Sequence, residues 1–144
     1  MKTLIDSCDV EMKCGVYGRT VIARLKPNED IVESLEKLCE SFEIRRAIVR
    51  SAVGSLIDGN LSVGGNTTLP VQLVKGPGVE IVGLFGEVVS TSASILDDQY
   101  STELTAILSG TDSQVVAGRL VRGMNPTFIT VEVTVQEWLS DSSQ

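Results

Sequence analysis

Apolar and polar residues alternate with a period of two along most of the chain, which is typical of β-strands with one buried face. The clearest run is 128–138, FITVEVTVQEW, where alternate positions are Ile or Val. Other strand-like runs occupy 19–25, 47–53, 56–63, 69–74 and 79–89. Short segments rich in Gly, Pro and Asn separate these runs, so we expect consecutive strands to pair in antiparallel fashion.

The stretch Glu103–Leu120, ELTAILSGTDSQVVAGRL, is predicted to be a β-hairpin. Its two apolar runs are joined by Gly110-Thr111-Asp112-Ser113, and these residue types are typical of turns between strands. With the two strands of this hairpin, and with 56–63 counted as the continuation of 47–53 after the break at Gly54-Ser55, the chain has about seven predicted strands. Pro70 is expected to place 69–74 near a sheet edge, because proline cannot donate to a strand ladder.

One segment, about 28–42, shows the periodicity of a helix. Its apolar stripe consists of Ile31, Leu35, Leu38, Cys39 and Phe42. Its opposite face consists of Glu33, Glu36, Lys37 and Glu40, which we interpret as a solvated surface. Asn28 is the expected N-cap, and Glu29 and Asp30 suit the positive end of the helix dipole.

These elements predict an α+β fold, namely a curved, mostly antiparallel sheet with the helix 28–42 packed on it. We expect one domain over residues 1–144, because this length is usual for a single domain. Gly83 and Gly86 lie inside the run 79–89 and suggest a bulge or a close backbone approach. Without a bulge, the odd separation of Glu80 and Glu87 would place their side chains on opposite faces.

The amino-acid composition limits the kinds of catalytic site and metal site that the chain can form. The sequence contains no histidine, which excludes a Ser-His-Asp triad and an imidazole metal ligand. Cys8, Cys14 and Cys39 lack metal-site spacing, so we interpret them as free thiols, with Cys39 on the buried face of the helix. We predict no catalytic residue, no metal and no cofactor.

The net charge and the hydropathy of the chain predict which partners it binds and where in the cell it is located. The net charge is −7, from 12 Lys and Arg against 19 Asp and Glu, and such a field disfavours direct binding to nucleic acid. No run approaches the ~20 apolar residues of a membrane span, so no membrane partner is expected. Charged residues near the N-terminus do not fit a signal peptide. We therefore expect a cytoplasmic protein.

Several blocks, taken in order, resemble the PPC domain, whose initials stand for plants and prokaryotes conserved. They are the strand 19–25, the helix from Asn28, AIVRSAVGSL at 47–56, KGPGVEIVGLFGEV at 75–88 and AILSGTDSQVVAGRLVRG at 106–123. The resemblance covers about 17–139. It implies a mostly antiparallel sheet with a packed helix, and it implies a homotrimer.

The same resemblance has implications for the binding of nucleic acid. In plants the domain accompanies an AT-hook, which contacts the minor groove of DNA, whereas prokaryotic members are stand-alone domains often labelled DNA-binding by analogy. The Arg-Gly-Arg-Pro core of an AT-hook occurs nowhere in this sequence. The part of the plant proteins that touches DNA is therefore missing here.

The hairpin carries a further implication of the resemblance. Many prokaryotic members have an HxH pair on its first strand and a third histidine on its second, and together these resemble a zinc site. The match puts Glu103 and Thr105 at the pair and Arg119 at the third position. A guanidinium does not ligate zinc. The implied pocket is metal-free, and Glu103 and Arg119 either pair across the hairpin, hold a small anion through Arg119, or are ordinary surface residues.

Three hypotheses on function follow. The first is a non-enzymatic, trimeric module that binds a partner or a small ligand. The second is DNA binding or a role in transcription by family analogy, which the net charge of −7 and the missing AT-hook disfavour. The third is an enzymatic or anion-binding pocket at Glu103, Thr105 and Arg119.

Overall fold

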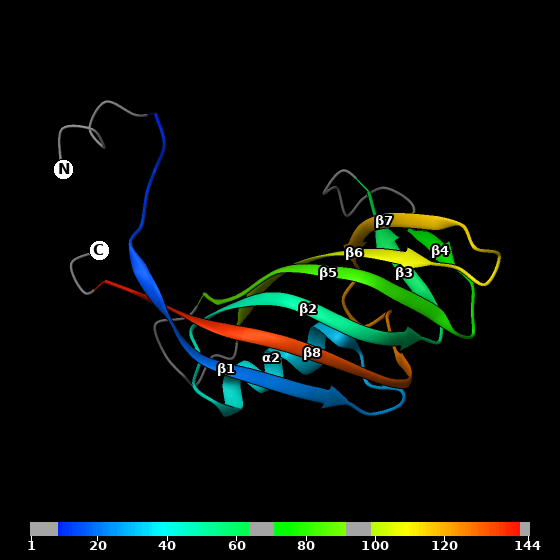
Figure 1. Ribbon diagram of the computed structural model, residues 1–144, viewed down its shortest axis with the longest axis horizontal. Helices are drawn as coiled ribbons and strands as arrows, with labels where there is room; N and C mark the ends of the chain where they lie inside the picture. Colours follow the sequence, from blue (N-terminus) through cyan, green and yellow to red (C-terminus); the bar gives the residue numbers. More distant parts are fainter. Residues whose placement is uncertain (1–8, 64–70, 92–98, 142–144) are drawn as a thin grey trace.

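The computed structural model describes residues 9–63, 71–91 and 99–141, in which eight strands form one sheet and one helix packs on it (Figure 1). The strands are β1 (Gly15–Leu25), β2 (Arg46–Leu56), β3 (Gly59–Ser62), β4 (Gln72–Val74), β5 (Val79–Ser90), β6 (Tyr100–Ser109), β7 (Val115–Leu120) and β8 (Thr127–Ser140). They lie in the order β1-β8-β2-β5-β6-β7-β3-β4, and every neighbouring pair is antiparallel. The predicted α+β class is confirmed, with one strand more than expected.

The predicted hairpin is β6 and β7. Its turn is closed by the N–H of Gly110, which donates to the Gln114 carbonyl oxygen at 2.9 Å. Ser113 takes a left-handed φ of 68° within this turn. The strand expected near a sheet edge is β4, which lies last in the strand order. Pro70, which suggested that position, falls outside the described residues.

The helix α2 runs over Ile31–Ser41, which is shorter at both ends than the predicted 28–42. Asp30 is its N-cap, and one carboxylate oxygen accepts from the Glu33 N–H at 3.0 Å. The prediction that Asn28 caps the helix is therefore wrong. Asn28 instead takes a left-handed φ of 69°, and its N–H donates to the Thr127 carbonyl oxygen at 2.8 Å. This contact with β8 holds Asn28 outside the helix, so the N-cap is Asp30, two residues later.

The core lies between α2 and one face of the sheet. The helix buries Ile31, Leu35 and Cys39 completely, as its predicted stripe requires, whereas Phe42 remains exposed. The strands contribute alternate residues to this core, including Val49, Leu84, Val88, Leu104, Ala106, Leu108, Val131, Val133 and Val135. Figure 1 shows α2 on this face only. Within the described ranges, no helix is long and apolar enough to cross a lipid bilayer.

A buried asparagine ties the chain before β8 to the start of α2. The Asn125 N–H donates to the second carboxylate oxygen of Asp30 at 2.9 Å. Its side chain accepts from the Asn60 N–H and donates to the carbonyl oxygens of Asn60 and Val121, at 2.8 to 3.0 Å. Every polar group of this buried amide is therefore satisfied, which is what burial of such a group requires.

We expect Asp30→Ala to lower the free energy of unfolding by about 1–2 kcal/mol, because the cap bond to Glu33 is lost and Asn125 loses an acceptor. Urea unfolding followed by circular dichroism measures this change. Asn28→Gly is the matched control and should stay within about 0.5 kcal/mol of the wild type, since glycine suits a left-handed φ. An equal cost for the two variants would contradict the assignment of the cap to Asp30.

Candidate functional site

The three positions singled out by the resemblance lie on the sheet face that α2 does not cover. Thr105 of β6 is directly opposite Arg119 of β7 in the antiparallel register. Glu103 lies two residues before Thr105 on β6, so its side chain points to the same face. Leu104 and Ala106, which alternate with them, are buried against the core. The hairpin therefore brings these three side chains onto one outer surface.

Arg119 and Glu103 form an ion pair across the hairpin, which is one of the arrangements that the sequence left open. Nη1 of Arg119 donates to Oε1 of Glu103 at 3.3 Å. The two side chains are 44% and 59% exposed, so water screens the attraction. Exposed pairs of this kind contribute under about 1 kcal/mol to stability. The pair therefore sets the charge of this surface more than it stabilises the fold.

A second ion pair continues this surface onto the next two strands. Nε and Nη2 of Arg46 in β2 donate to Oε2 of Glu87 in β5, at 3.1 and 2.8 Å. Glu87 is directly opposite Glu103 in the β5–β6 register. The resulting charged row consists, in strand order, of Arg46, Glu87, Glu103 and Arg119. Two facing carboxylates repel each other, and an arginine at each end of the charged row offsets that repulsion.

Sequence reasoning did not assign Arg46 and Glu87 to this surface. The register between β5 and β6 shifts between Ile81 and Gly83, and the buried positions of β5 change from odd to even numbers there. Glu80 and Glu87 therefore lie on the same face, as the bulge alternative allowed. The two glycines in β5 were the signal for that bulge, but only the strand order places Glu87 beside Glu103.

At Gly86 the backbones of β5 and β6 approach closely. Gly86 has a φ of 146°, and a Cβ atom there would overlap the Glu103 carbonyl oxygen. Only glycine permits this approach, because any side chain would meet the neighbouring backbone. The close approach holds Glu87 and Glu103 side by side on the outer face.

A cleft of about 380 Å³ opens beside the ion pair of the hairpin. Its lining residues are Ser62, Val71, Ser101, Thr102, Glu103, Leu104, Arg119, Leu120 and Val121. Thr105 is not among them, so the cleft unites two of the three expected site residues. It offers one guanidinium, one carboxylate and several hydroxyls. Among the described residues, no cluster of three His, Cys, Asp or Glu side chains could hold a metal ion.

Residues 12–139 match the family model of the Plants and Prokaryotes Conserved domain, abbreviated PCC. The chain belongs to this family. The match confirms the resemblance drawn from the sequence blocks. None of the curated proteins compared with the chain matches it significantly.

Solved structures share the fold of this PCC domain at low sequence identity. A PPC protein of Pyrococcus horikoshii is 19% identical, with a TM-score of 0.71 over 92% of this chain and 87% of its own. A metal-containing protein of Archaeoglobus fulgidus is 21% identical, with a TM-score of 0.71 over 92% and 88%. A candidate DNA-binding protein of Bacteroides thetaiotaomicron is 18% identical, with a TM-score of 0.66 over 88% and 85%. Identities this low show a common fold and no more.

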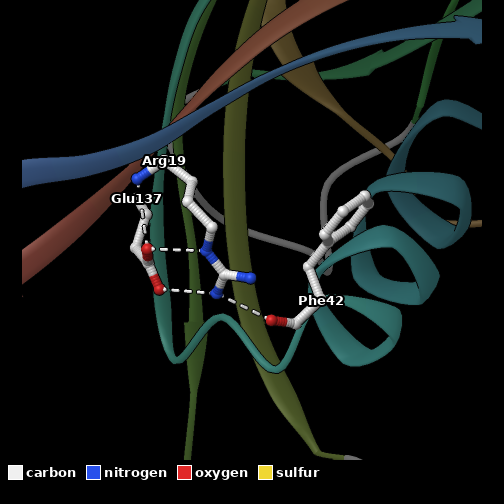
Figure 2. Close-up of polar contacts among 3 residues, drawn as sticks. All are labelled: Arg19, Phe42 and Glu137. Carbon is white, nitrogen blue, oxygen red and sulfur yellow. Dashed lines mark hydrogen bonds and ion pairs between the residues drawn. The ribbon is translucent and has the colours of Figure 1, made fainter.

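A second polar cluster of the PCC domain joins β1, β8 and the end of α2 (Figure 2). Arg19 donates from Nε to Oε1 of Glu137 at 3.1 Å and from Nη2 to Oε2 at 3.0 Å. Nη2 also donates to the Phe42 carbonyl oxygen at 2.7 Å, which anchors the C-terminal end of the helix. The side-chain hydrogen bonds from Arg19 hold the pKa of Glu137 below its ordinary value. Because Glu137 is buried, this cluster serves the fold rather than a ligand.

Burial also decides the reactivity of the Cys39 thiol. Desolvation raises the pKa of Cys39 to about 12, so this thiol stays protonated at neutral pH. A protonated thiol is a poor nucleophile and a poor metal ligand. Cys39 is therefore a core residue, as the helix periodicity predicted.

The lowered pKa of Glu137 predicts a pH-dependent contribution to stability. A carboxylate whose folded-state pKa is depressed stabilises the fold at neutral pH, and this contribution is lost as pH falls through that pKa. We expect Glu137→Gln to lower the free energy of unfolding by about 1.5–3 kcal/mol at neutral pH, with the deficit shrinking below about pH 4. Urea unfolding at neutral and acidic pH tests this.

Glu132→Gln is the matched control for Glu137→Gln. Glu132 also lies on β8 and pairs with an arginine of β1, Arg24, but both side chains are well exposed. Its loss should cost under about 1 kcal/mol. A deficit for Glu137→Gln that does not change with pH would contradict the role assigned to its ionised form.

The hairpin positions can be tested by restoring histidines. We expect the triple variant Glu103→His, Thr105→His and Arg119→His to bind one zinc ion, because the three side chains share one face and zinc prefers imidazole nitrogens at about 2.0–2.1 Å. Calorimetric titration of the dialysed proteins measures binding, and the wild type should show none. In the control variant, Val115→His replaces the change at Arg119, since Val115 lies opposite Ser109 and away from Glu103. Equal zinc affinity in both variants would show that the hairpin match is misplaced.

Proposed function

We propose that this PCC domain is a non-enzymatic binding module that works as a homotrimer. The observation that carries the proposal is the apolar patch on the outer sheet face, which consists of Val53, Val82 and Phe85. These side chains are 73%, 61% and 50% exposed, and they lie on the neighbouring central strands β2 and β5. Exposed apolar residues gathered in one place are typical of protein interaction surfaces.

A second copy of the chain is the proposed occupant of this apolar patch. The family resemblance implies self-association, and the patch lies where the helix leaves the sheet uncovered. The charged row next to it carries both signs, with Arg46 and Arg119 at its ends and Glu87 and Glu103 between them. A surface with both signs can pair with another copy of itself without a net charge penalty, although each chain carries −7 overall.

Light scattering on the purified chain should give a mass of three times 15.4 kDa. We expect Phe85→Lys to shift the mass toward the monomer, because a buried lysine without a partner is costly in an interface. Circular dichroism should show that the variant remains folded. Leu73→Lys is the control, since Leu73 is 56% exposed on the edge strand β4 and far along the strand order from Phe85. A monomeric wild type, or an unchanged mass for Phe85→Lys, would contradict the proposal.

The hairpin cleft supports a second candidate function, the binding of a small anion. Arg119 lines the cleft, and its guanidinium has donors beyond the one that Glu103 occupies. Glu103 neutralises this arginine, so an incoming anion must compete with a carboxylate already in place. For this reason we rank anion binding at the hairpin below self-association.

Direct DNA binding is the weakest of the three candidates. Its support is that two structural neighbours, from Bacteroides thetaiotaomicron and Ralstonia eutropha, are candidate DNA-binding proteins. The overall charge of −7 opposes approach to phosphates, and Arg46, from the richest basic stretch of the sequence, is held by Glu87. A partner protein or a ligand therefore fits this chain better than a duplex does.

A further inference from the structure

A second cleft lies near the β1 edge of the sheet and is separate from the hairpin cleft. It has a volume of about 410 Å³, which is a size typical of small-molecule sites. Its lining residues are Glu11 and Lys13 from the segment before β1, Tyr17 of β1, Arg46 and Ile48 of β2, and Trp138 of β8. We call it the tryptophan cleft. Neither the family match nor the proposed self-association assigns it a role.

Two aromatic rings form the apolar wall of the tryptophan cleft. Tyr17 and Trp138 are directly opposite each other in the β1–β8 register, and their rings meet edge to face with centroids 5.8 Å apart. The indole N–H donates to Oγ of Ser140 at 3.1 Å, so the polar group of the ring is satisfied within the protein. Ile48 adds an aliphatic surface. Such a wall suits the flat, apolar body of an aromatic ligand.

Two cations face this wall. Arg46 uses Nε and Nη2 to bind Glu87, and its Nη1 has no partner among the described residues. Lys13 likewise makes no ion pair within the part of the chain that the structure describes. The bonds from Glu87 fix the plane of the guanidinium, so Nη1 is a positioned donor rather than a freely moving one. Lys13 and Arg46 thus offer donors to one negative group.

One carboxylate limits the charge that the cleft accepts. Glu11 lies two residues before Lys13 in the segment that precedes β1, and both residues line the cleft. With Glu11 present, and Glu87 behind Arg46, a dianion such as a phosphate would meet more repulsion than a single carboxylate would. The charge pattern therefore favours a monoanion.

We propose that the tryptophan cleft binds a small aromatic carboxylate. Its ring lies against Trp138 and Ile48, and its carboxylate lies between Lys13 and Nη1 of Arg46. Binding leaves the Arg46–Glu87 pair intact, because that pair uses the other two nitrogens of the guanidinium.

The test uses Trp138, which is the only tryptophan of the chain. Its fluorescence is recorded while the full chain is titrated with hydrocinnamate, with phenethylamine, which has the ring but the opposite charge, and with propionate, which has the charge but no ring. We expect a saturable change with hydrocinnamate at millimolar concentration or below. Phenethylamine and propionate should produce none.

Two variants change the affinity in opposite directions. Arg46→Gln should weaken hydrocinnamate binding about tenfold, the usual effect of losing a hydrogen bond to a charged group. Glu11→Gln should strengthen it, because a like charge is removed and Glu11 makes no ion pair among the described residues. Arg24→Gln is the matched control, since Arg24 is an exposed arginine of β1 outside the cleft, and it should leave the affinity unchanged.

Three results would overturn the proposal. They are the absence of any saturable change with hydrocinnamate, equal affinities for hydrocinnamate and phenethylamine, and wild-type affinity in both Arg46→Gln and Glu11→Gln. The Glu11 variant keeps the test decisive even if loss of Arg46 disturbs the sheet. Arg46 belongs to both the charged row and the tryptophan cleft. The light-scattering experiment on Phe85 measures mass and the fluorescence titration measures ligand binding, so a failure of self-association is recognised separately.

Discussion

A single helix of eleven residues can cover only one face of an eight-stranded sheet, and this limit shapes the molecule. Ile31, Leu35 and Cys39 of α2 bury one set of alternate strand residues, and the other set faces outward. An antiparallel sheet with one solvated face normally carries polar residues there. Val53 and Phe85 depart from that rule at the centre of the outer face. Their exposure costs free energy in an isolated chain, which is why we look for the function on this face rather than in the core.

Local pattern was enough to predict most of the fold. Alternation predicted β8, the helical stripe predicted α2, and turn residues predicted the hairpin. The cap was misplaced because Asn28 and Asp30 are both good caps in isolation, and the choice between them depends on a backbone bond from Asn28 to Thr127. The start of the helix is likewise decided by contacts with Asn125 and Thr127, and no local pattern encodes those contacts. Its other end is followed by Glu43, which takes a left-handed φ of 55°.

Part of the candidate site could likewise be predicted from the sequence, and part of it could not. Glu103 and Arg119 could be placed together from the sequence because a hairpin fixes its own register over a few residues. Arg46 and Glu87 could not, because their meeting depends on the order β2-β5-β6 and on a bulge in β5. Neutral imidazoles at the hairpin would need a cation to bring them together, whereas Glu103 and Arg119 carry opposite charges and attract each other without one. The pairing of Glu103 with Arg119 therefore needs no metal ion between the two side chains.

The charged row and the tryptophan cleft share one residue, Arg46. This residue ends the charged row and also lines the tryptophan cleft. A guanidinium is a planar fork with five donors, so two nitrogens can hold Glu87 while the third faces a ligand. A lysine has one nitrogen, and sharing it between Glu87 and a ligand would leave neither interaction well oriented. An arginine at this position therefore lets the outer face keep its internal charge balance, with Glu87 neutralised beside Glu103, while the neighbouring cleft retains a donor for an anion.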